Sequence, residues 1–162
     1  MRHGTRLFRS DQHGTAAVEM ALMLPLLITL LFGGLEGAHY LYVEHQVVKG
    51  VRDGARYAGR LPFADVSCGT VSASAETAIK EVTRTGQTSG GTSRVRGWTN
   101  AQVTVTPACV TAIQTGIYKT MTGAPRITVS ATVPYTSLFR SVTGIDVNAK
   151  VHASQQAAAM GV

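Results

Sequence analysis

The chain has 162 residues, of which 44% are hydrophobic and only 15% charged, and its net charge is +6. This composition excludes disorder of the whole chain, and the length suits one modest domain with appendages. The basic residues are dispersed, without a dense block interleaved with aromatics, so nucleic acid is not an expected partner. The two cysteines, Cys68 and Cys109, fit neither a zinc site nor a CxxC redox motif.

Residues 15–35 form an apolar run whose one charged residue is Glu19. A helix of this length extends about 30 Å, which is the hydrocarbon thickness of a bilayer. Its large apolar side chains fall on every side of the helix, unlike those of a surface helix with a single buried face. A buried core helix is the alternative, but so small a chain can hardly enclose it. The run therefore predicts a transmembrane helix.

The flanks of this run predict its orientation. Arg2, Arg6 and Arg9 precede it, and positive charge stays cytoplasmic, so the N-terminus lies inside and the remainder outside. Three fates remain open: a cleaved signal peptide, an uncleaved single-pass anchor, or removal of the basic leader alone. The signal peptide is the weakest, because the run is longer than a usual apolar core and lacks a good A-x-A site.

The segment "HGTAAVEMALMLPLLITLLFGGLEGAHYLYVEHQVVKGVRDGARYAG" resembles the N-terminal region of TadE-like proteins, the pseudopilins of Tad/Flp-type pilus machines. The resemblance rests on a basic leader, Gly14 five residues before Glu19, an apolar helix containing "LPL", and "DGARYAG" at residues 53–59. It covers residues 1 to about 60 well. Beyond that it holds only in outline, through a β-rich part with "VPYTSLF" at residues 133–139.

The resemblance implies cleavage after Gly14 by a prepilin peptidase, so that Thr15 becomes the N-terminus and Glu19 the fifth residue. The Glu19 carboxylate would then pair with the new amine, its own or a neighbour's, because an unpaired charge in low dielectric is strongly penalised. The alternative is that Glu19 only lies at the membrane interface, where the helix dipole favours it by about 0.3–1 kcal/mol. Met20 departs from the pattern, because pilins of this system usually have an aromatic residue there.

The helical pattern continues beyond the membrane as a stalk over residues 36–60. Apolar residues recur at steps of three and four, and basic residues lie on the other face. Pro62 is expected to end the helix. The apolar face can pack on the chain's own domain or on a partner's helix, and both possibilities stay open. It consists of Tyr40, Val43, Val47, Val51, Ala55 and Ala58.

Residues 61–162 are expected to form an outer α+β domain. Residues 72–86 predict a short helix, capped by Ser72 or Ser74 and ended by Gly86. Three runs alternate apolar and polar residues and predict antiparallel strands, at 101–109, 126–135 and 144–154. A short helix and turn is expected between the first two. The predicted fold class is α+β, with a long N-terminal helix and a sheet of three to four strands.

The predicted location of Cys68 and Cys109 outside the inner membrane permits a disulfide. Such a bond closes a loop of about 40 residues and is worth up to about 4 kcal/mol in the entropy model. Two unrelated buried thiols are the alternative. We expect the bond, because the chain contains one pair of cysteines and both lie outside the apolar run.

The sequence contains no catalytic or metal-binding motif, so no enzyme, no cofactor and no metal are predicted. Its histidines are scattered, and His39 and His45 fall on different helix faces. The predicted organisation is a leader at 1–14, a membrane helix at 15–35, a stalk at 36–60 and a periplasmic domain at 61–162. The predicted function is that of a minor pilin or pseudopilin in the bacterial inner membrane. A secreted or anchored binding domain is the alternative function.

The partners that the resemblance implies are the prepilin peptidase, other TadE-like pseudopilins and the major pilin, together with the membrane.

Overall fold

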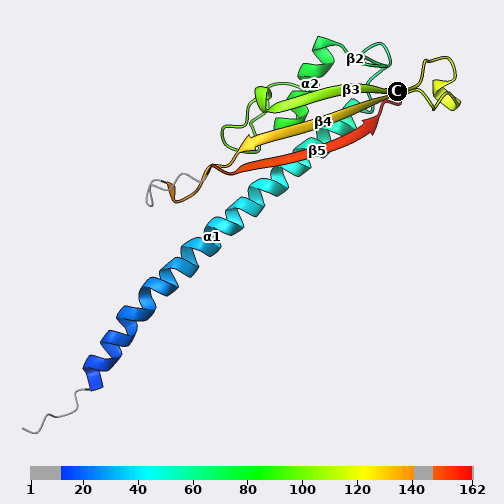
Figure 1. Ribbon diagram of the computed structural model, residues 1–162. Helices are drawn as coiled ribbons and strands as arrows, with labels where there is room; N and C mark the ends of the chain where they lie inside the picture. Colours follow the sequence, from blue (N-terminus) through cyan, green and yellow to red (C-terminus); the bar gives the residue numbers. More distant parts are fainter. Residues whose placement is uncertain (1–11, 141–147, 162) are drawn as a thin grey trace, which may run out of the picture. The chain divides into compact units, whose positions relative to one another are not determined.

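The computed structural model describes residues 12–140 and 148–161 and divides the chain into two units, residues 1–38 and 39–162 (Figure 1). Helix α1, Gln12–Ala58, contributes its first part to one unit and its second part to the other. It ends two residues before the predicted end of the stalk and four before Pro62. The two units are described separately below.

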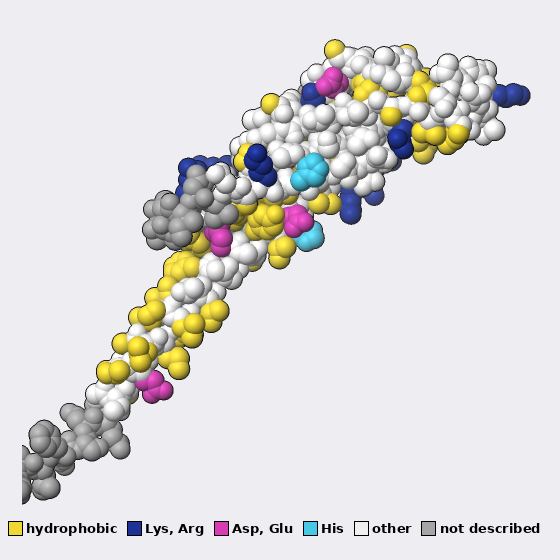
Figure 2. Space-filling model, viewed as in Figure 1, with side chains coloured by type: hydrophobic (Ala, Val, Ile, Leu, Met, Phe, Trp, Pro, Cys, Tyr) yellow, Lys and Arg dark blue, Asp and Glu magenta, His cyan; other side chains and the backbone are white. Residues whose placement is uncertain are grey.

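The described part of the first unit, residues 12–38, is the N-terminal part of α1. Its large apolar side chains are exposed on all sides, with 74% of Leu22 and 60% of Leu31 accessible. Apolar side chains accordingly dominate this stretch in the space-filling view (Figure 2). Pro25 lies inside the helix, and the Thr29 hydroxyl donates to the Pro25 carbonyl oxygen at 2.8 Å. Among the described residues, this helix alone is long and apolar enough to cross a membrane.

The second unit contains a three-stranded antiparallel sheet in the order β3-β4-β5. The strands are β3, Val103–Val110; β4, Ala124–Pro134; and β5, Lys150–Ala158. The register pairs Val129 of β4 with Val105 on one side and with Gln155 on the other. A two-stranded hairpin, β1 at Val66–Ser67 and β2 at Thr70–Val71, precedes the sheet. The predicted α+β fold class with an antiparallel sheet is thus confirmed.

The core forms between the second part of α1 and one face of the sheet. Alternate residues of β4 point inward because side chains on a strand alternate between its two faces. Half of the strand residues on the opposite face of the sheet are threonine, serine or glutamine. The stalk face therefore packs on its own domain. The buried set includes Val43, Val47, Val51, Ala55, Ala58, Ile79, Trp98, Val103, Ile127, Val129, Ala131, Val133 and Val151.

Helix α2, Ala73–Thr85, confirms the helix predicted over residues 72–86. The Ser72 hydroxyl accepts a hydrogen bond from the Ala75 backbone at 3.3 Å, which satisfies one of the unpaired donors of the first turn. Gly86 ends the helix with a φ of +84°, in the left-handed region that glycine adopts without strain. Short 3-10 turns lie at Asn100–Gln102 and, between β3 and β4 as expected, at Gly116–Tyr118.

The third strand differs from its prediction over residues 144–154. Only its second half is shared with β5, which extends further to Ala158, while residues 144–147 lie outside the described residues. The sequence "SQQAA" at 154–158 has low β propensity. It is a strand because every residue from Lys150 to Ala158 pairs with a residue of β4. The β1–β2 hairpin was not predicted.

Candidate functional site

The predicted processing and assembly residues lie together at the start of α1. Gly14, Thr15 and Glu19 are all helical and exposed. The bond between Gly14 and Thr15 falls in the first turn of the helix, where few hydrogen bonds must open to expose it. Thr15 and Glu19 are one turn apart and so share a face, separated by about 6 Å along the axis.

Glu19 borders two shallow apolar grooves on this exposed helix. One is lined by Gly14, Thr15, Val18 and Leu22, and the other contains Met20, Met23 and Leu27 among its walls. Between residues 14 and 35 Glu19 is the only charged side chain. It is therefore a single carboxylate set in an apolar surface that no other described residue of its unit covers.

The "DGARYAG" segment attaches the second part of α1 to the rest of the second unit. Asp53 accepts a charged hydrogen bond from Arg94 at 2.7 Å, and both side chains are partly buried. Ala55 and Ala58 are buried in the core. The Gly59 carbonyl accepts from the Met160 backbone at 2.8 Å, which ties the end of the helix to the end of the chain.

Two glycines let α1 approach α2 closely. A methyl group on Gly50 would overlap the Thr83 carbonyl oxygen and lie 2.8 Å from the Trp98 ring. One on Gly54 would overlap the Thr83 hydroxyl. Sequence reasoning did not predict this contact or the Asp53–Arg94 pair. The spacing of two glycines by four residues on a helix was the available signal.

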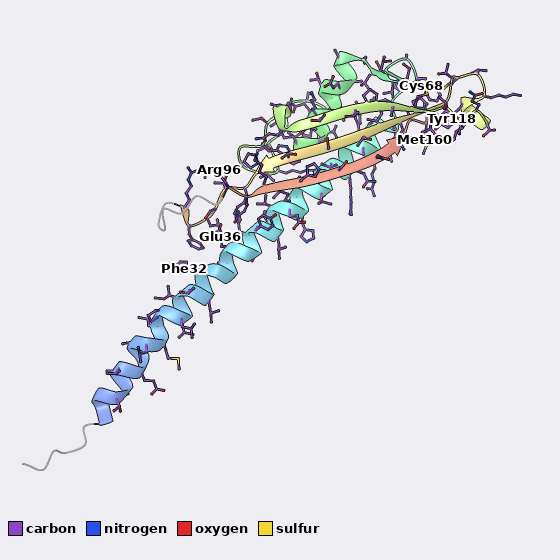
Figure 3. All side chains as sticks on the ribbon, in the orientation of Figure 1. Phe32, Glu36, Cys68, Arg96, Tyr118 and Met160 are labelled. Carbon is purple, nitrogen blue, oxygen red and sulfur yellow. A yellow bond between two sulfur atoms is a disulfide. The ribbon has the colours of Figure 1, made fainter. Side chains whose placement is uncertain are left out.

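Cys68 and Cys109 form a disulfide, with their Cα atoms 4.6 Å apart. Cys68 lies in the turn between β1 and β2, where Gly69 has a φ of +82°, and Cys109 lies in β3 opposite Pro125. The bond therefore fastens the hairpin to the sheet. The predicted pairing is confirmed. Figure 3 labels Cys68 at the same end of the domain as Tyr118 and Met160.

A polar network joins α2 to the turn that precedes β3. Glu81 accepts from Arg84 at 2.8 Å and from the Asn100 amide at 2.8 Å, and Arg84 also donates to Asn100 at 3.1 Å. These bonds favour the ionised carboxylate. The Asn100 amide first, and then Arg84, hold the pKa of Glu81 below its ordinary value, although partial burial opposes them.

The histidines in the described part of the chain are dispersed, and no metal centre was predicted for them. His39 contacts the Tyr135 hydroxyl at 3.0 Å, and His152 contacts the Thr132 hydroxyl at 2.9 Å on the sheet. His45 is exposed on α1. Within residues 12–140 and 148–161, no three histidine, cysteine or acidic side chains gather into a group that could hold a metal ion.

Residues 14–56 match the family described as TadE-like protein. No curated protein and no solved structure matches the chain. The matched range begins at Gly14 and includes Glu19, both close-packed glycines and Asp53. This family is associated with Tad-type pili as a structural component, and together with the apolar helix it fits a single-pass membrane protein. The match confirms the resemblance seen in the sequence: residues 14–56 of this chain are similar to the TadE-like family.

Proposed function

We propose that this protein is a minor pilin or pseudopilin-like component in the assembly of a Tad/Flp-type pilus or a related secretion machine. Residues 15–35 anchor it in the inner membrane, and residues 61–162 form its periplasmic domain. The observation that carries the proposal is the TadE-like match over residues 14–56, because it spans the apolar helix with its single carboxylate.

The mechanism begins with cleavage of the bond between Gly14 and Thr15 by a prepilin peptidase at the cytoplasmic face. Cleavage leaves an ammonium group at the helix start, one turn from the Glu19 carboxylate. In an apolar environment this pair is strongly directional, and a neighbouring subunit that supplies either charge can satisfy the other. Glu19 would thereby set the stagger between packed helices. The partners proposed are sister TadE-like proteins and the major pilin.

Processing is tested by the intact mass and N-terminal sequence of the protein from the membrane fraction of its native host. We expect a chain that starts at Thr15 and remains membrane-bound. Gly14→Leu should abolish cleavage, because a large side chain replaces hydrogen before the scissile bond. Gly34→Leu is the matched control, since a side chain meets no neighbouring atom at either position. A start at Met1 would leave a plain anchor, and a start near Gly37 would indicate a signal peptide; either contradicts the proposal.

The assembly role is tested by Glu19→Gln, which keeps the size of the side chain and removes its charge. We expect normal membrane insertion and normal cleavage, with loss of pili or of copurifying pilus components. Glu44→Gln is the matched control, because Glu44 is an exposed carboxylate on the same helix. Pili at the level of the unaltered strain with Glu19→Gln would refute the proposed role of this carboxylate.

A further inference from the structure

The two edge strands of the three-stranded sheet, β3 and β5, differ in how far other elements cover them. Strand β3 contacts α2 and the β1–β2 hairpin, and it contains Pro107. Strand β5 is the last strand of the sheet, and among the described residues no strand pairs with its outer side. His152, Ser154 and Gln156 are exposed there, and β5 contains no proline. An open edge of this kind is a template for another strand.

The direction of the backbone groups of β5 follows from two hydrogen bonds. The Ala159 N–H donates to the Pro125 carbonyl, and the Ala149 carbonyl accepts from the Tyr135 N–H. The backbone N–H and C=O groups of odd-numbered residues therefore face β4. Alternate residues of an antiparallel strand point their N–H and C=O groups in opposite directions. The groups of His152, Ser154 and Gln156 therefore point to the open edge.

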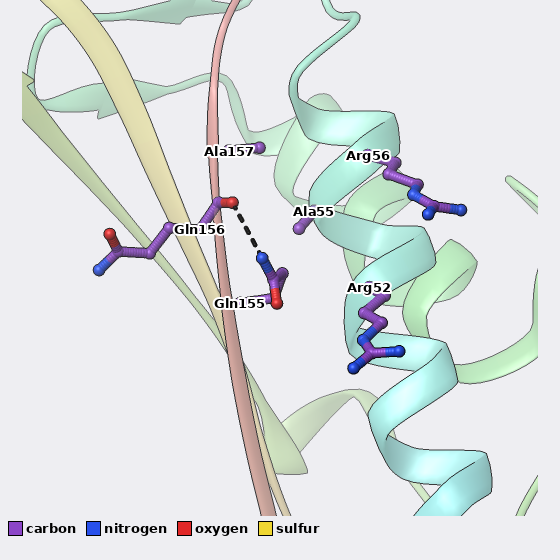
Figure 4. Close-up of a pocket in the computed structure, with 6 residues that line it drawn as sticks. All are labelled: Arg52, Ala55, Arg56, Gln155, Gln156 and Ala157. Atoms are coloured by element: carbon purple, nitrogen blue, oxygen red, sulfur yellow. Dashed lines mark hydrogen bonds between the residues drawn. The ribbon is translucent and has the colours of Figure 1, made fainter.

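A groove of about 230 Å³ lies between this strand and α1 (Figure 4). It is lined by Arg52, Ala55, Arg56, Gln155, Gln156 and Ala157. Inside it, the Gln155 side-chain amide donates to the Gln156 carbonyl at 3.4 Å. This long bond occupies an edge acceptor that an added strand would use.

The helix side of the groove is positively charged. His45, Lys49, Arg52 and Arg56 fall on the side of α1 opposite to its buried face, and all are exposed. Neither Arg52 nor Arg56 forms an ion pair with another described residue. Figure 4 shows the Arg56 side chain extending from α1 on the side away from β5, and the Arg52 side chain lying in front of the helix. Both are exposed, and exposed side chains change rotamer within nanoseconds.

The charge of the domain argues against a second copy of this chain as the natural occupant. Between residues 39 and 161, the described residues include 12 lysines and arginines but 5 acidic residues, a difference of +7. Three of those acidic residues, Asp53, Glu76 and Glu81, are already in ion pairs. Among the described residues of the domain, only Glu44 and Asp65 remain outside ion pairs, so another copy offers little acidic surface to these arginines.

We propose that the open edge of β5 binds an extended acidic segment of a partner protein, which adds to the sheet as a fourth strand. Its backbone pairs with the edge groups of β5, and its carboxylates reach Arg52 and Arg56. The spacings agree: alternate residues of a strand are about 6.8 Å apart, and residues four apart on a helix are about 6 Å apart. The recognised pattern is therefore two acidic residues separated by one, and this inference does not depend on cleavage at Gly14.

The experiment measures binding of a fluorescent peptide, Thr-Val-Glu-Val-Glu-Val-Thr, to the full chain in detergent by anisotropy at low ionic strength. A peptide with glutamine in place of both glutamates should bind about tenfold more weakly, since two partly exposed ion pairs contribute about that much. Arg52→Gln with Arg56→Gln should cause the same loss for the glutamate peptide. Arg126→Gln, an exposed arginine on β4, is the control and should change nothing.

Strand addition is separated from simple charge attraction by N-methylation of the peptide. Two peptides methylated on complementary sets of alternate amides keep their charges, but one of them loses the N–H groups that face β5. We expect one methylated peptide to lose binding and the other to retain it. Equal binding of both, equal binding of the glutamine peptide, or unchanged binding by the double arginine variant would each overturn the proposal.

Discussion

Because α1 and α2 cross closely, we predict that replacing glycine with alanine in α1 lowers the stability of the protein, whereas helix propensity alone would raise it. Glycine to alanine inside a helix ordinarily stabilises by about 1 kcal/mol. At Gly50 the added methyl would overlap the main-chain oxygen of Thr83 and press on the Trp98 ring at 2.8 Å. Overpacking of this kind costs about 1–3 kcal/mol, and a main-chain atom cannot rotate away. After the propensity gain is subtracted, Gly50→Ala should therefore destabilise the protein by up to about 2 kcal/mol.

Gly54→Ala should also destabilise, but for a reason that a second substitution can remove. There the methyl would overlap the oxygen of the Thr83 hydroxyl, and this hydroxyl donates to the Ile79 carbonyl at 2.8 Å. Thr83→Ala deletes that oxygen. The double variant should thus be more stable than the sum of the two single changes predicts. No such rescue is expected for Gly50→Ala, because its obstacle is the backbone.

Trp98, the only tryptophan of the chain, is 1% exposed and reports on this packing directly. Thermal unfolding of the full chain in detergent, followed by its fluorescence, should show a midpoint lower by about 4 °C for each kcal/mol. Gly37→Ala is the control, because a methyl there meets no atom within 4 Å and should not destabilise. A midpoint for Gly50→Ala as high as that control, or equal rescue of both variants by Thr83→Ala, would refute the reasoning.

Three other predictions concern single interactions and are read from urea unfolding. Cys68→Ala opens a bond between positions 41 residues apart and should cost up to about 4 kcal/mol; an unchanged midpoint would contradict this. Arg94→Met should cost about 1–3 kcal/mol, because it leaves the partly buried Asp53 without its partner; adding Asp53→Asn should cost little more. Glu81 has a lowered pKa, so its contribution is complete above about pH 4.3 and is lost as pH falls through the folded-state value. Glu81→Gln should therefore destabilise at about pH 7, and this difference should shrink as the pH falls below about 4.3; an unchanged difference would disprove the linkage.

Local signals account for the parts of the fold that the sequence predicts well. Helix α2 begins after Ser72 and stops at Gly86, as predicted, because capping is decided within one turn of the chain. The apolar stripe of the stalk and the alternation in β4 are equally local. The length of β5, in contrast, is not set by local signals, because Gln155 and Gln156 are in a strand only through pairing with β4.

The candidate sites also differ in whether a local sequence signal predicts them. Gly14 and Glu19 stand out in the sequence because one charge in an apolar run is visible without a structure. Asp53 and Arg94 are 41 residues apart, and no local sequence feature of either residue predicts that the two form a pair. The open edge of β5 depends on strand order, which the sequence pattern leaves undetermined.

The fastening of the chain's end to Gly59 has a mechanical consequence. The helix and the sheet are joined at two ends: Tyr40 packs edge-on against Tyr135 at one, and Met160 bonds to Gly59 at the other. Between them, about 30 Å of helix lies on the sheet. Tension applied along the helix axis loads all these contacts in shear at once rather than peeling them one by one. A chain held by this helix can therefore carry load through the interface without the sheet separating from the helix.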